Sequence, residues 1–488
     1  MTILQSNVFS RKWLPVTTAG LLFAVVYMAI QDYIAVPWND EIGTADTAVN
    51  YVLFGKWDSN VWHYTYNPLH AFLLIGWLKI FGISHAIVCN INVFIALLAF
   101  LYLEYTTIKR SIITKPTSGL VLVLLFWLGF MLASLMTKGR IDILVMFLSI
   151  ILTDCLFDNE KGIVAYTKIF ISSTLLIMSS IYVIPFFVLV IIFFYAINFC
   201  DISRTQWLIK GSVTALGFIV GMALTCVFYY KIGFLYHFLS TYISFNGSIG
   251  EASKGLSARL FDAYNSDPTS ICLCACAWLV VLISKKKDKL FLTMLAIVTL
   301  VPTIMTFAGR YASYYVWMVE LPVSVLVVYL MDRTEKKGIY YMLLTVVAVI
   351  SMLRPAYWIY KRPAEYNQRM ELYSFIDNNR EYLNRTDNIY FSDAMCYYKV
   401  VENRKTRYYL NNDNLTVNPN IINALSSLAV LRDYKEYYPE EYLPKEGIMI
   451  TTSNWSLETG MRELQSHNYS YQLLAQDGEY AISSFKRN

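Results

Sequence analysis

Two acidic residues, Asp40 and Glu41, directly follow the first long apolar segment of the chain. They stand at the head of a stretch in which small and apolar residues recur with helical spacing as far as Gly55, which predicts a helix over residues 40–55. Carboxylates at the edge of an apolar segment can accept protons or bind cations. Asn39 or Asp40 can equally be the N-cap of that helix. The residues alone leave both interpretations open.

A second charged cluster, Lys138-Gly139-Arg140-Ile141-Asp142, lies in a turn between two apolar segments. Charged groups at the edge of a membrane are costly unless they are paired or functional. The simpler alternative is that Lys138 and Arg140 extend to the membrane interface, with Asp142 as their counter-ion.

Two further sites carry polar and aromatic residues together. Arg310 and Tyr311 open a late apolar segment, where an aromatic belt explains the tyrosine but not the arginine. A run from Trp62 to His70 leads into another apolar helix. A lone interfacial histidine is more often a surface residue than a ligand, so His63 and His70 can be interpreted in either of these two ways. Its candidates for positioning a substrate are His63, Tyr66 and Asn67.

The composition predicts a polytopic membrane protein. The 488 residues are 56% hydrophobic and 15% charged, with a mean hydropathy of +0.44. The net charge of +5 reflects basic residues between apolar segments, so a nucleic-acid partner is not expected. Most of the eight cysteines lie in apolar segments, which excludes a disulfide framework. The first apolar segment, 14–30, follows Arg11 and Lys12 and predicts a retained anchor.

The distribution of basic residues predicts which apolar segments cross the membrane. Segment 68–83 begins with a proline, contains Lys79 and is short, so we expect it to lie in the interface. Leaving it out places the basic clusters on the same side as Arg11, which predicts eleven crossings, an inside N terminus and an outside C terminus. The twelve apolar windows are 13–30, 68–83, 85–105, 117–137, 141–157, 164–182, 184–199, 210–230, 269–284, 289–307, 312–331 and 338–354.

This topology divides the chain into two predicted parts. Residues 1–354 form an all-α membrane domain, with outer loops at 32–84 and 231–268. Residues 355–488 form an outer α/β domain, with strands expected at 388–391, 448–452 and 479–485 and helices at 364–378 and 421–434.

Taken in order along the chain, these features resemble the GT-C superfamily of integral-membrane glycosyltransferases. The likeness covers residues 1–330. The bacterial members of this superfamily that the chain resembles include the aminoarabinose and protein-mannosyl transferases. In size and outer segments the chain is also similar to the serotype-converting O-antigen glucosyltransferases. The residues that carry the likeness are Asp40-Glu41 before a helix ending at Gly55, a Pro-Leu helix from Pro68 to Gly82, the Arg140-x-Asp142 turn, and Arg310-Tyr311 before Leu321-Pro322.

The resemblance implies an enzyme that moves a sugar, with a hexose such as glucose expected, from a polyprenyl-phosphate carrier to an acceptor hydroxyl, with inversion. The acceptor would be a glycan, a glycolipid such as O-antigen, or a protein. Asp40 matches the family's first-loop acid and would be the general base, with Glu41 and Asp142 completing the catalytic set. Charge develops on the lipid phosphate, and the candidates to bind it are Arg140, Arg310, Tyr311, Lys231, Lys254 and Arg259.

One departure limits the resemblance. The first-loop proline, Pro68, follows Tyr66 and Asn67, where the aminoarabinose transferases have Glu-Lys, so the acceptor arrangement of that subfamily is not expected here. A divalent cation, Mg²⁺ or Mn²⁺, on Asp40 and Asp142 stays open, as does a softer metal site that includes His63.

Two other functional classes compete with a transferase. Charges at the membrane boundary also mark the substrate paths of transporters and lipid flippases. A scaffold subunit of an envelope assembly could use the outer domain to bind a partner. The clustering of acids at one face favours the transferase, located in a bacterial cytoplasmic membrane with its C-terminal domain in the periplasm. The sequence leaves open the sugar, the acceptor, and whether the carrier is undecaprenyl or dolichyl.

Overall fold

The fold was analysed in a computed structural model of the whole chain. It describes residues 11–37, 39–55, 57, 68–158, 160–198, 203–233, 235, 238–239, 275, 278, 295, 299–300, 317–386, 388–391, 393–401, 406–409, 446–466 and 468–488.

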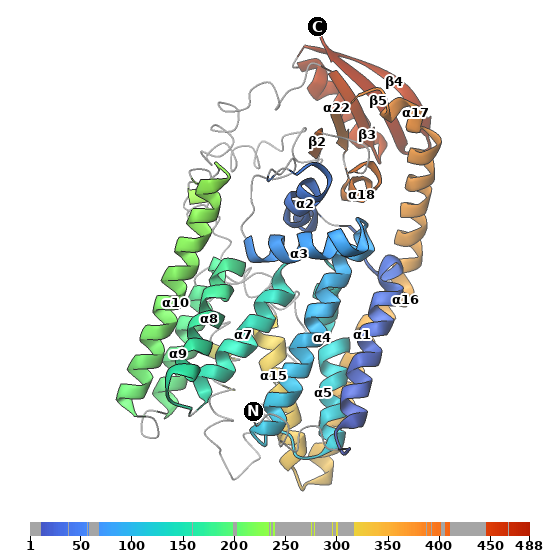
Figure 1. The fold of residues 1–488 in the computed structure, drawn as a ribbon. Helices are drawn as coiled ribbons and strands as arrows, with labels where there is room; N and C mark the ends of the chain where they lie inside the picture. The colour runs from blue at the N-terminus through green and yellow to red at the C-terminus, as the bar shows by residue number, and fades with distance from the viewer. Residues whose placement is uncertain are drawn as a thin grey trace.

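A bundle of apolar helices makes up most of the described chain (Figure 1). Among the described residues, four helices are long and apolar enough to cross a membrane, namely α1, α4, α10 and α16. The expected windows at 269–284 and 289–307 lie almost entirely outside the described residues. The helices of this part are α1 (Leu14–Ile34), α2 (Asn39–Phe54), α3 (Pro68–Phe81), α4 (His85–Lys109), α5 (Pro116–Leu128), α6 (Phe130–Met136), α7 (Asp142–Phe157), α8 (Ile163–Ser179), α9 (Ile184–Asn198), α10 (Arg204–Lys231), α15 (Trp317–Arg333) and α16 (Lys337–Asn378), with a 3₁₀ turn η3 (Ile181–Val183) before α9.

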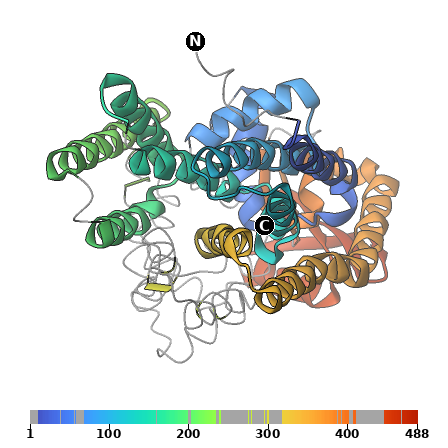
Figure 2. The ribbon, with the colours of Figure 1, turned by 90° about the horizontal axis from the view of Figure 1, so that it is seen from below.

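The bundle has two sides. Viewed along its length, the green helices α8, α9 and α10 group on one side, and the blue-to-cyan α1, α4 and α5 group with the yellow-to-orange α15 and α16 on the other (Figure 2). Close packing of α1 on α4 requires Gly20, because a Cβ atom there would lie 2.4 Å from Cε1 of Phe100. The buried face of α1 continues through Tyr27 and includes a polar residue, Gln31, which has no exposed surface.

Helix α3 lies across one end of the bundle, beside α2 (Figure 1). It has 14 residues and is therefore about 21 Å long, too short for a hydrocarbon core of about 30 Å. The short Pro68 segment thus has the transverse orientation that its length predicts.

The window expected at 117–137 is not one continuous helix. It breaks at Gly129 into α5 and α6, and the carboxylate of Glu320 on α15 accepts a hydrogen bond of 2.9 Å from the backbone N–H of Leu132. A side chain at Gly129 would meet this carboxylate, since a Cβ atom there would lie 2.6 Å from Oε1 of Glu320. A buried acid from a distant helix therefore satisfies the backbone that the break exposes.

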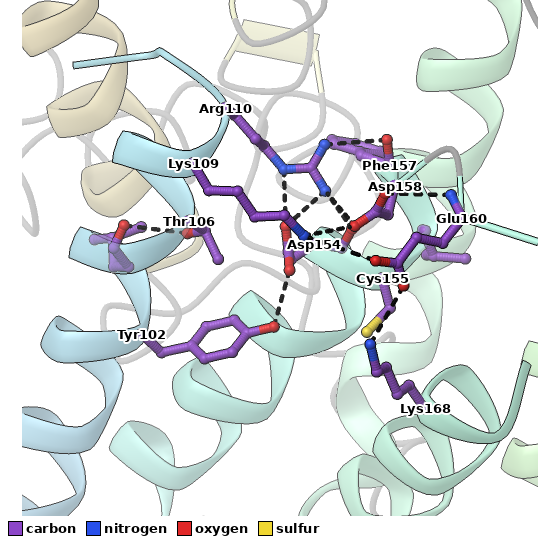
Figure 3. A network of polar contacts seen from close by, with 12 residues as sticks. Tyr102, Thr106, Lys109, Arg110, Asp154, Cys155, Phe157, Asp158, Glu160 and Lys168 are labelled. Carbon is purple, nitrogen blue, oxygen red and sulfur yellow. Dashed lines mark hydrogen bonds and ion pairs between the residues drawn. The ribbon is translucent and has the colours of Figure 1, made fainter. Parts of the chain in front are cut away.

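A polar cluster joins α4 to α7 at the end of the bundle that lies away from α2 and α3 (Figures 1 and 3). Arg110 Nη2 lies 2.6 Å from Oδ1 of Asp154, and Tyr102 donates a hydrogen bond of 2.9 Å to Oδ2 of the same carboxylate. Lys109 Nζ lies 3.2 Å from Oδ2 of Asp158. Lys109 and Arg110, which belong to the basic residues that the sequence analysis assigns to the inner face, are thus at the opposite end from the C-terminal domain.

Helix α16 connects the bundle to the C-terminal domain without a break. Its 42 residues extend for about 63 Å, roughly twice the thickness of a hydrocarbon core. The helix continues through Pro355 and Pro363, so the change of composition after residue 354 falls inside a helix. Figure 1 shows its second half leading up to the sheet.

The described residues of the C-terminal part form a five-stranded mixed sheet in the order β2-β1-β3-β5-β4. Strand β1 is parallel to β2 and β3, whereas β5 is antiparallel to β3 and β4. The central β3 is buried along all of its residues after Glu446. The strands are β1 (Asn388–Phe391), β2 (Thr406–Tyr409), β3 (Glu446–Thr451), β4 (Tyr469–Asp477) and β5 (Tyr480–Arg487), and the helices are α17 (Arg380–Leu383), η5 (Ala394–Cys396), α18 (Tyr397–Val400) and α22 (Asn454–Ser466).

Three of these strands match the stretches predicted at 388–391, 448–452 and 479–485. The sequence analysis did not predict β2, β4 or α22. The helix expected at 364–378 is the end of α16, and the one expected at 421–434 lies outside the described residues.

Candidate functional site

The predicted first-loop helix is α2, and its ends match the sequence pattern. It begins at Asn39 and is followed by Gly55, whose φ of +69° is a left-handed conformation that favours glycine. Ile42, Ala45 and Val49 form a fully buried face. Because α2 is packed down by this face, acids on the same helix are held against the end of the bundle.

Glu41 is fully buried, and three side chains converge on its Oε1 atom. His85 Nε2, in the first turn of α4, lies 2.8 Å away. The hydroxyl of Tyr398 donates a hydrogen bond of 3.2 Å, and Cys89 Sγ lies at 3.8 Å. Glu41, assigned to the catalytic set in the sequence analysis, is therefore held beneath the surface by groups from α4 and the C-terminal domain.

Asp40, the predicted base, precedes Glu41 in the first turn of α2. The structure describes its backbone but not its side chain.

The turn that contains Arg140 packs directly on Glu41. A Cβ atom on Gly139 would lie 2.8 Å from Cγ of Glu41 and 2.4 Å from Cγ1 of Val88, so only glycine fits without a shift. Asn92 of α4 fixes the turn by donating hydrogen bonds of 2.5 Å to the carbonyl groups of both Lys138 and Arg140. The structure thus brings together two clusters that lie about a hundred residues apart in the sequence.

Arg140 and Asp142 form an ion pair in this turn. Arg140 Nε lies 2.8 Å from Oδ2 of Asp142, and the two side chains are 13% and 7% exposed. Asp142 is also the first residue of α7, where a negative charge is favourable to the helix dipole. Burial, with the charge of Arg140 next in importance, lowers the pKa of the neighbouring Lys138. The counter-ion relationship expected for Asp142 is therefore present, at a mostly buried position.

The C-terminal domain contributes two tyrosines from α18 to the same site. Tyr397 donates a hydrogen bond of 2.5 Å to Oδ1 of Asp46 on α2, and Tyr398 reaches Glu41. Burial and the nearby charge of Glu41 raise the pKa of Tyr398 well above its usual value, so this hydroxyl remains a donor at neutral pH. The sequence analysis missed both tyrosines.

Helix α4 contributes a polar stripe that the sequence analysis also missed. His85, Cys89 and Asn92 are spaced by four and three residues, which places them on one face of a helix that is otherwise largely apolar. All three are buried. The spacing of these polar residues inside an apolar segment was the available signal.

The remaining predicted residues lie on α10, on α3 or outside the described residues. Lys231 ends α10 and is exposed, one turn beyond Phe228, whose ring contacts Phe72 of α3 at 5.4 Å between centroids. His70 of α3 is fully buried, and burial lowers its pKa to about 4. The candidates His63, Tyr66, Asn67, Lys254, Arg259, Arg310 and Tyr311 lie outside the described residues.

The geometry around Glu41 excludes a nucleophile-base-acid triad. In a triad the histidine contacts the nucleophile through one ring nitrogen and the acid through the other. Here the same atom, Nε2 of His85, faces both Glu41 Oε1 and, at 3.4 Å, Cys89 Sγ. Within the described residues, these three side chains also form the one group whose ligand atoms could surround a metal ion.

Comparison with known proteins identifies the fold. No protein-family model matches the chain, and no curated protein matches its sequence. ArnT from Cupriavidus metallidurans bound to undecaprenyl phosphate aligns with a TM-score of 0.64 at 10% identity, covering 97% of this chain and 98% of that one. The oligosaccharyltransferase of Archaeoglobus fulgidus in complex with Zn and sulfate aligns with a TM-score of 0.51 at 11% identity, covering 95% of this chain and 72% of that one. The chain therefore has the fold of ArnT and of this oligosaccharyltransferase, in agreement with the resemblance of its sequence to the GT-C superfamily.

Proposed function

We propose that this protein is a glycosyltransferase that moves a sugar from a polyprenyl-phosphate carrier to an acceptor hydroxyl at the outer face of a membrane. The observation that carries the proposal is the meeting of α2 with the Arg140-Asp142 turn at one end of a GT-C bundle. The solved relative ArnT, which aligns over almost the whole chain, is bound to undecaprenyl phosphate.

In this proposal Asp40 is the general base. The acceptor hydroxyl is a weak nucleophile near neutral pH, and its attack on the anomeric carbon requires a group that takes its proton. Arg140 lies at the level of α2 and would stabilise the charge that develops on the lipid phosphate as it leaves. Arg310, Tyr311, Lys231, Lys254 and Arg259 are the further candidates for this phosphate. A single displacement at the anomeric carbon inverts its configuration.

Asp142 and Glu41 have positioning roles in the same proposal. Asp142 holds the Arg140 guanidinium through their 2.8 Å contact. Glu41 fixes the first turn of α2, and with it the adjacent Asp40, against α4. A divalent cation used in the reaction would bind to Asp40 and Asp142. The residues that would contact the acceptor are His63, Tyr66 and Asn67.

The proposal also covers the orientation of the protein in the membrane and the identity of its substrates. The positive-inside rule places the cluster of Lys109 and Arg110 in the cytoplasm, so the C-terminal domain at the opposite end would be periplasmic. The first acceptor to test is a surface polysaccharide such as O-antigen, with a hexose as the sugar.

Binding of the carrier can be measured without knowing the sugar or the acceptor. The detergent-solubilised protein is incubated with undecaprenyl phosphate or with undecaprenol, and the complexes are counted by native mass spectrometry. We expect the phosphate to bind in preference to the alcohol, and we expect Arg140→Met to reduce that preference. Equal binding of the two lipids contradicts the proposed carrier.

Transfer is then tested in a bacterium with a defined surface polysaccharide and a matching lipid-linked hexose. Mass spectrometry of the repeat unit should show one added hexose with the wild-type protein and none with Asp40→Asn. Asp377→Asn is the matched control, because it makes the same chemical change at a half-exposed acid that pairs with Arg380. Retained transfer in Asp40→Asn at equal protein level contradicts the proposed base.

A further inference from the structure

The cluster of Glu41, His85 and Cys89 has a use that the transfer reaction does not require. The three residues come from two elements, the first turn of α2 and the first two turns of α4. Their exposed fractions are 0%, 3% and 0%. A carboxylate, an imidazole and a thiol that face one another without solvent form a set of ligands of mixed hardness rather than an acidic patch.

The distances between the ligand atoms lie within about 0.5 Å of those in a tetrahedral site. With metal-ligand bonds of about 2.0 Å to nitrogen and oxygen and about 2.3 Å to sulfur, neighbouring ligand atoms lie about 3.3–3.6 Å apart. The observed distances are 2.8 Å between Nε2 of His85 and Oε1 of Glu41, 3.4 Å between this nitrogen and Sγ of Cys89, and 3.8 Å between Sγ and Oε1. Shifts of a few tenths of an ångström bring all three within range of one ion.

Further oxygen atoms lie beside the same cluster. The carbonyl oxygen of Thr137 is 3.6 Å from Sγ of Cys89. The Gln31 side chain neighbours the Cys89 thiol and donates a hydrogen bond of 2.9 Å to the carbonyl of Met136. Its Oε1 atom is buried and has no hydrogen-bond partner among the described residues, and the same is true of Oε2 of Glu41. Unsatisfied buried oxygens are costly, so their presence at this cluster points to a cation.

We propose that Glu41, His85 and Cys89 bind a structural zinc ion, with an oxygen of Gln31 or Thr137 as the fourth ligand. Thiolate and imidazole ligands select zinc over the magnesium or manganese that all-oxygen sites prefer. A zinc ion with one thiolate and one carboxylate carries no net charge, which suits a buried position. Because the surroundings are closed, the ion would hold α2 on α4 rather than activate a substrate.

The metal content tests this proposal directly, without any donor or acceptor. The full-length protein is purified in detergent from cells supplied with zinc, and its metals are measured by inductively coupled plasma mass spectrometry. We expect about one zinc per chain, as a single closed site requires. His85→Gln and Cys89→Ser should lose the metal. Cys155→Ser should retain it, because that cysteine lies near the other end of the bundle, beside Asp154.

A second measurement distinguishes metal binding from misfolding of a variant. A zinc chelator should lower the Tm of the wild-type protein, and added zinc should restore it, whereas the Tm of a monodisperse Cys89→Ser protein should not respond to either. Replacement of the ion by Co²⁺ should give a thiolate charge-transfer absorption that Cys155→Ser keeps and Cys89→Ser lacks.

Two outcomes overturn the site. One is a wild-type protein that contains no zinc and whose Tm is unchanged by the chelator. The other is zinc that remains in both His85→Gln and Cys89→Ser. Positioning of Asp40 by the ion rests on the proposed function, but metal content and Tm are measured without transfer. A failure of the transferase proposal would therefore leave these results unchanged.

Discussion

The hydroxyl of Tyr398 in the C-terminal domain donates a hydrogen bond of 3.2 Å to the buried Oε1 of Glu41 in α2. The two residues are 357 positions apart in the sequence. The neighbouring Tyr397 makes the equivalent contact with Asp46. The C-terminal domain therefore packs on α2 through hydrogen bonds to two acids of this helix, Glu41 and Asp46.

Removal of the Tyr398 hydroxyl should destabilise the protein. Tyr398→Phe leaves part of a buried carboxylate without its donor, which costs about 1–3 kcal/mol. We expect a lower Tm in detergent and reduced transfer. Tyr480→Phe is the control, because its hydroxyl donates to the carbonyl of Gln368 at an exposed position. Equal effects of the two changes would show that the Glu41 contact has no special importance.

The ion pair of Arg140 and Asp142 should show strong coupling in a double-mutant cycle. Asp142→Leu alone leaves a mostly buried guanidinium without its nearest carboxylate, whereas Arg140→Met with Asp142→Leu removes both charges. We expect the double variant to lose less stability than the sum of the single variants, by at least about 1 kcal/mol. Chemical denaturation of the purified protein measures the difference, and additive losses would contradict the coupling. Transfer should be lost in all three variants, because the proposed phosphate ligand is removed or displaced.

Replacement of Arg369 in α16 by lysine should destabilise the protein more than the same replacement of a surface arginine. It is 2% exposed, donates a hydrogen bond of 2.9 Å to the carbonyl of Ala35, and also contacts Asp32. Lysine keeps the charge but not the forked donors, so Arg369→Lys should cost about 1–3 kcal/mol. Arg380→Lys is the control, since Arg380 pairs with Asp377 at 43% and 42% exposure and should change stability by less than about 1 kcal/mol. Thermal unfolding compares the two, and an equally small change in both would contradict the role of Arg369.

His70 should make the protein less stable in mild acid. Its pKa falls from 6.5 to about 4 because it is buried, so below pH 6.5 the unfolded chain binds a proton that the folded chain does not. The contribution to stability is therefore complete above about pH 6.5 and is lost as the pH falls toward 4, by up to about 3 kcal/mol. We expect His70→Met to show a smaller drop in Tm than the wild type between about pH 7.5 and about pH 5. The same drop in both proteins would contradict this assignment.

Local patterns were sufficient to predict much of the fold. The apolar windows that lie within the described residues are helical, Gly55 follows the end of α2, and the short segment after Pro68 lies across the bundle. The distribution of charges placed Asp40-Glu41 and Arg140-x-Asp142 on the same face of the membrane, and in the structure Gly139 of the turn packs on Glu41 of α2.

The contacts that complete the site depend on long-range packing, which no local pattern encodes. His85 and Cys89 lie in an apolar segment that predicts a spanning helix, and nothing near them in the sequence indicates that they face Glu41. Tyr398 lies in a short helix of the polar C-terminal part, whose position over α2 is fixed by α16 and the sheet. Strand β4 was not predicted because its buried and exposed residues do not alternate regularly.

The uninterrupted course of α16 has a consequence for dividing this protein into parts. A cut at the composition boundary after residue 354 would sever a helix in mid-course and remove Arg369 from the end of α1. It would also take away the hydroxyls that cover Glu41 and Asp46. The apolar half expressed alone would then lose one hydrogen-bond donor to each of these two buried carboxylates. The bundle and the polar half therefore form a single unit for recombinant expression, and the two should be produced as one polypeptide.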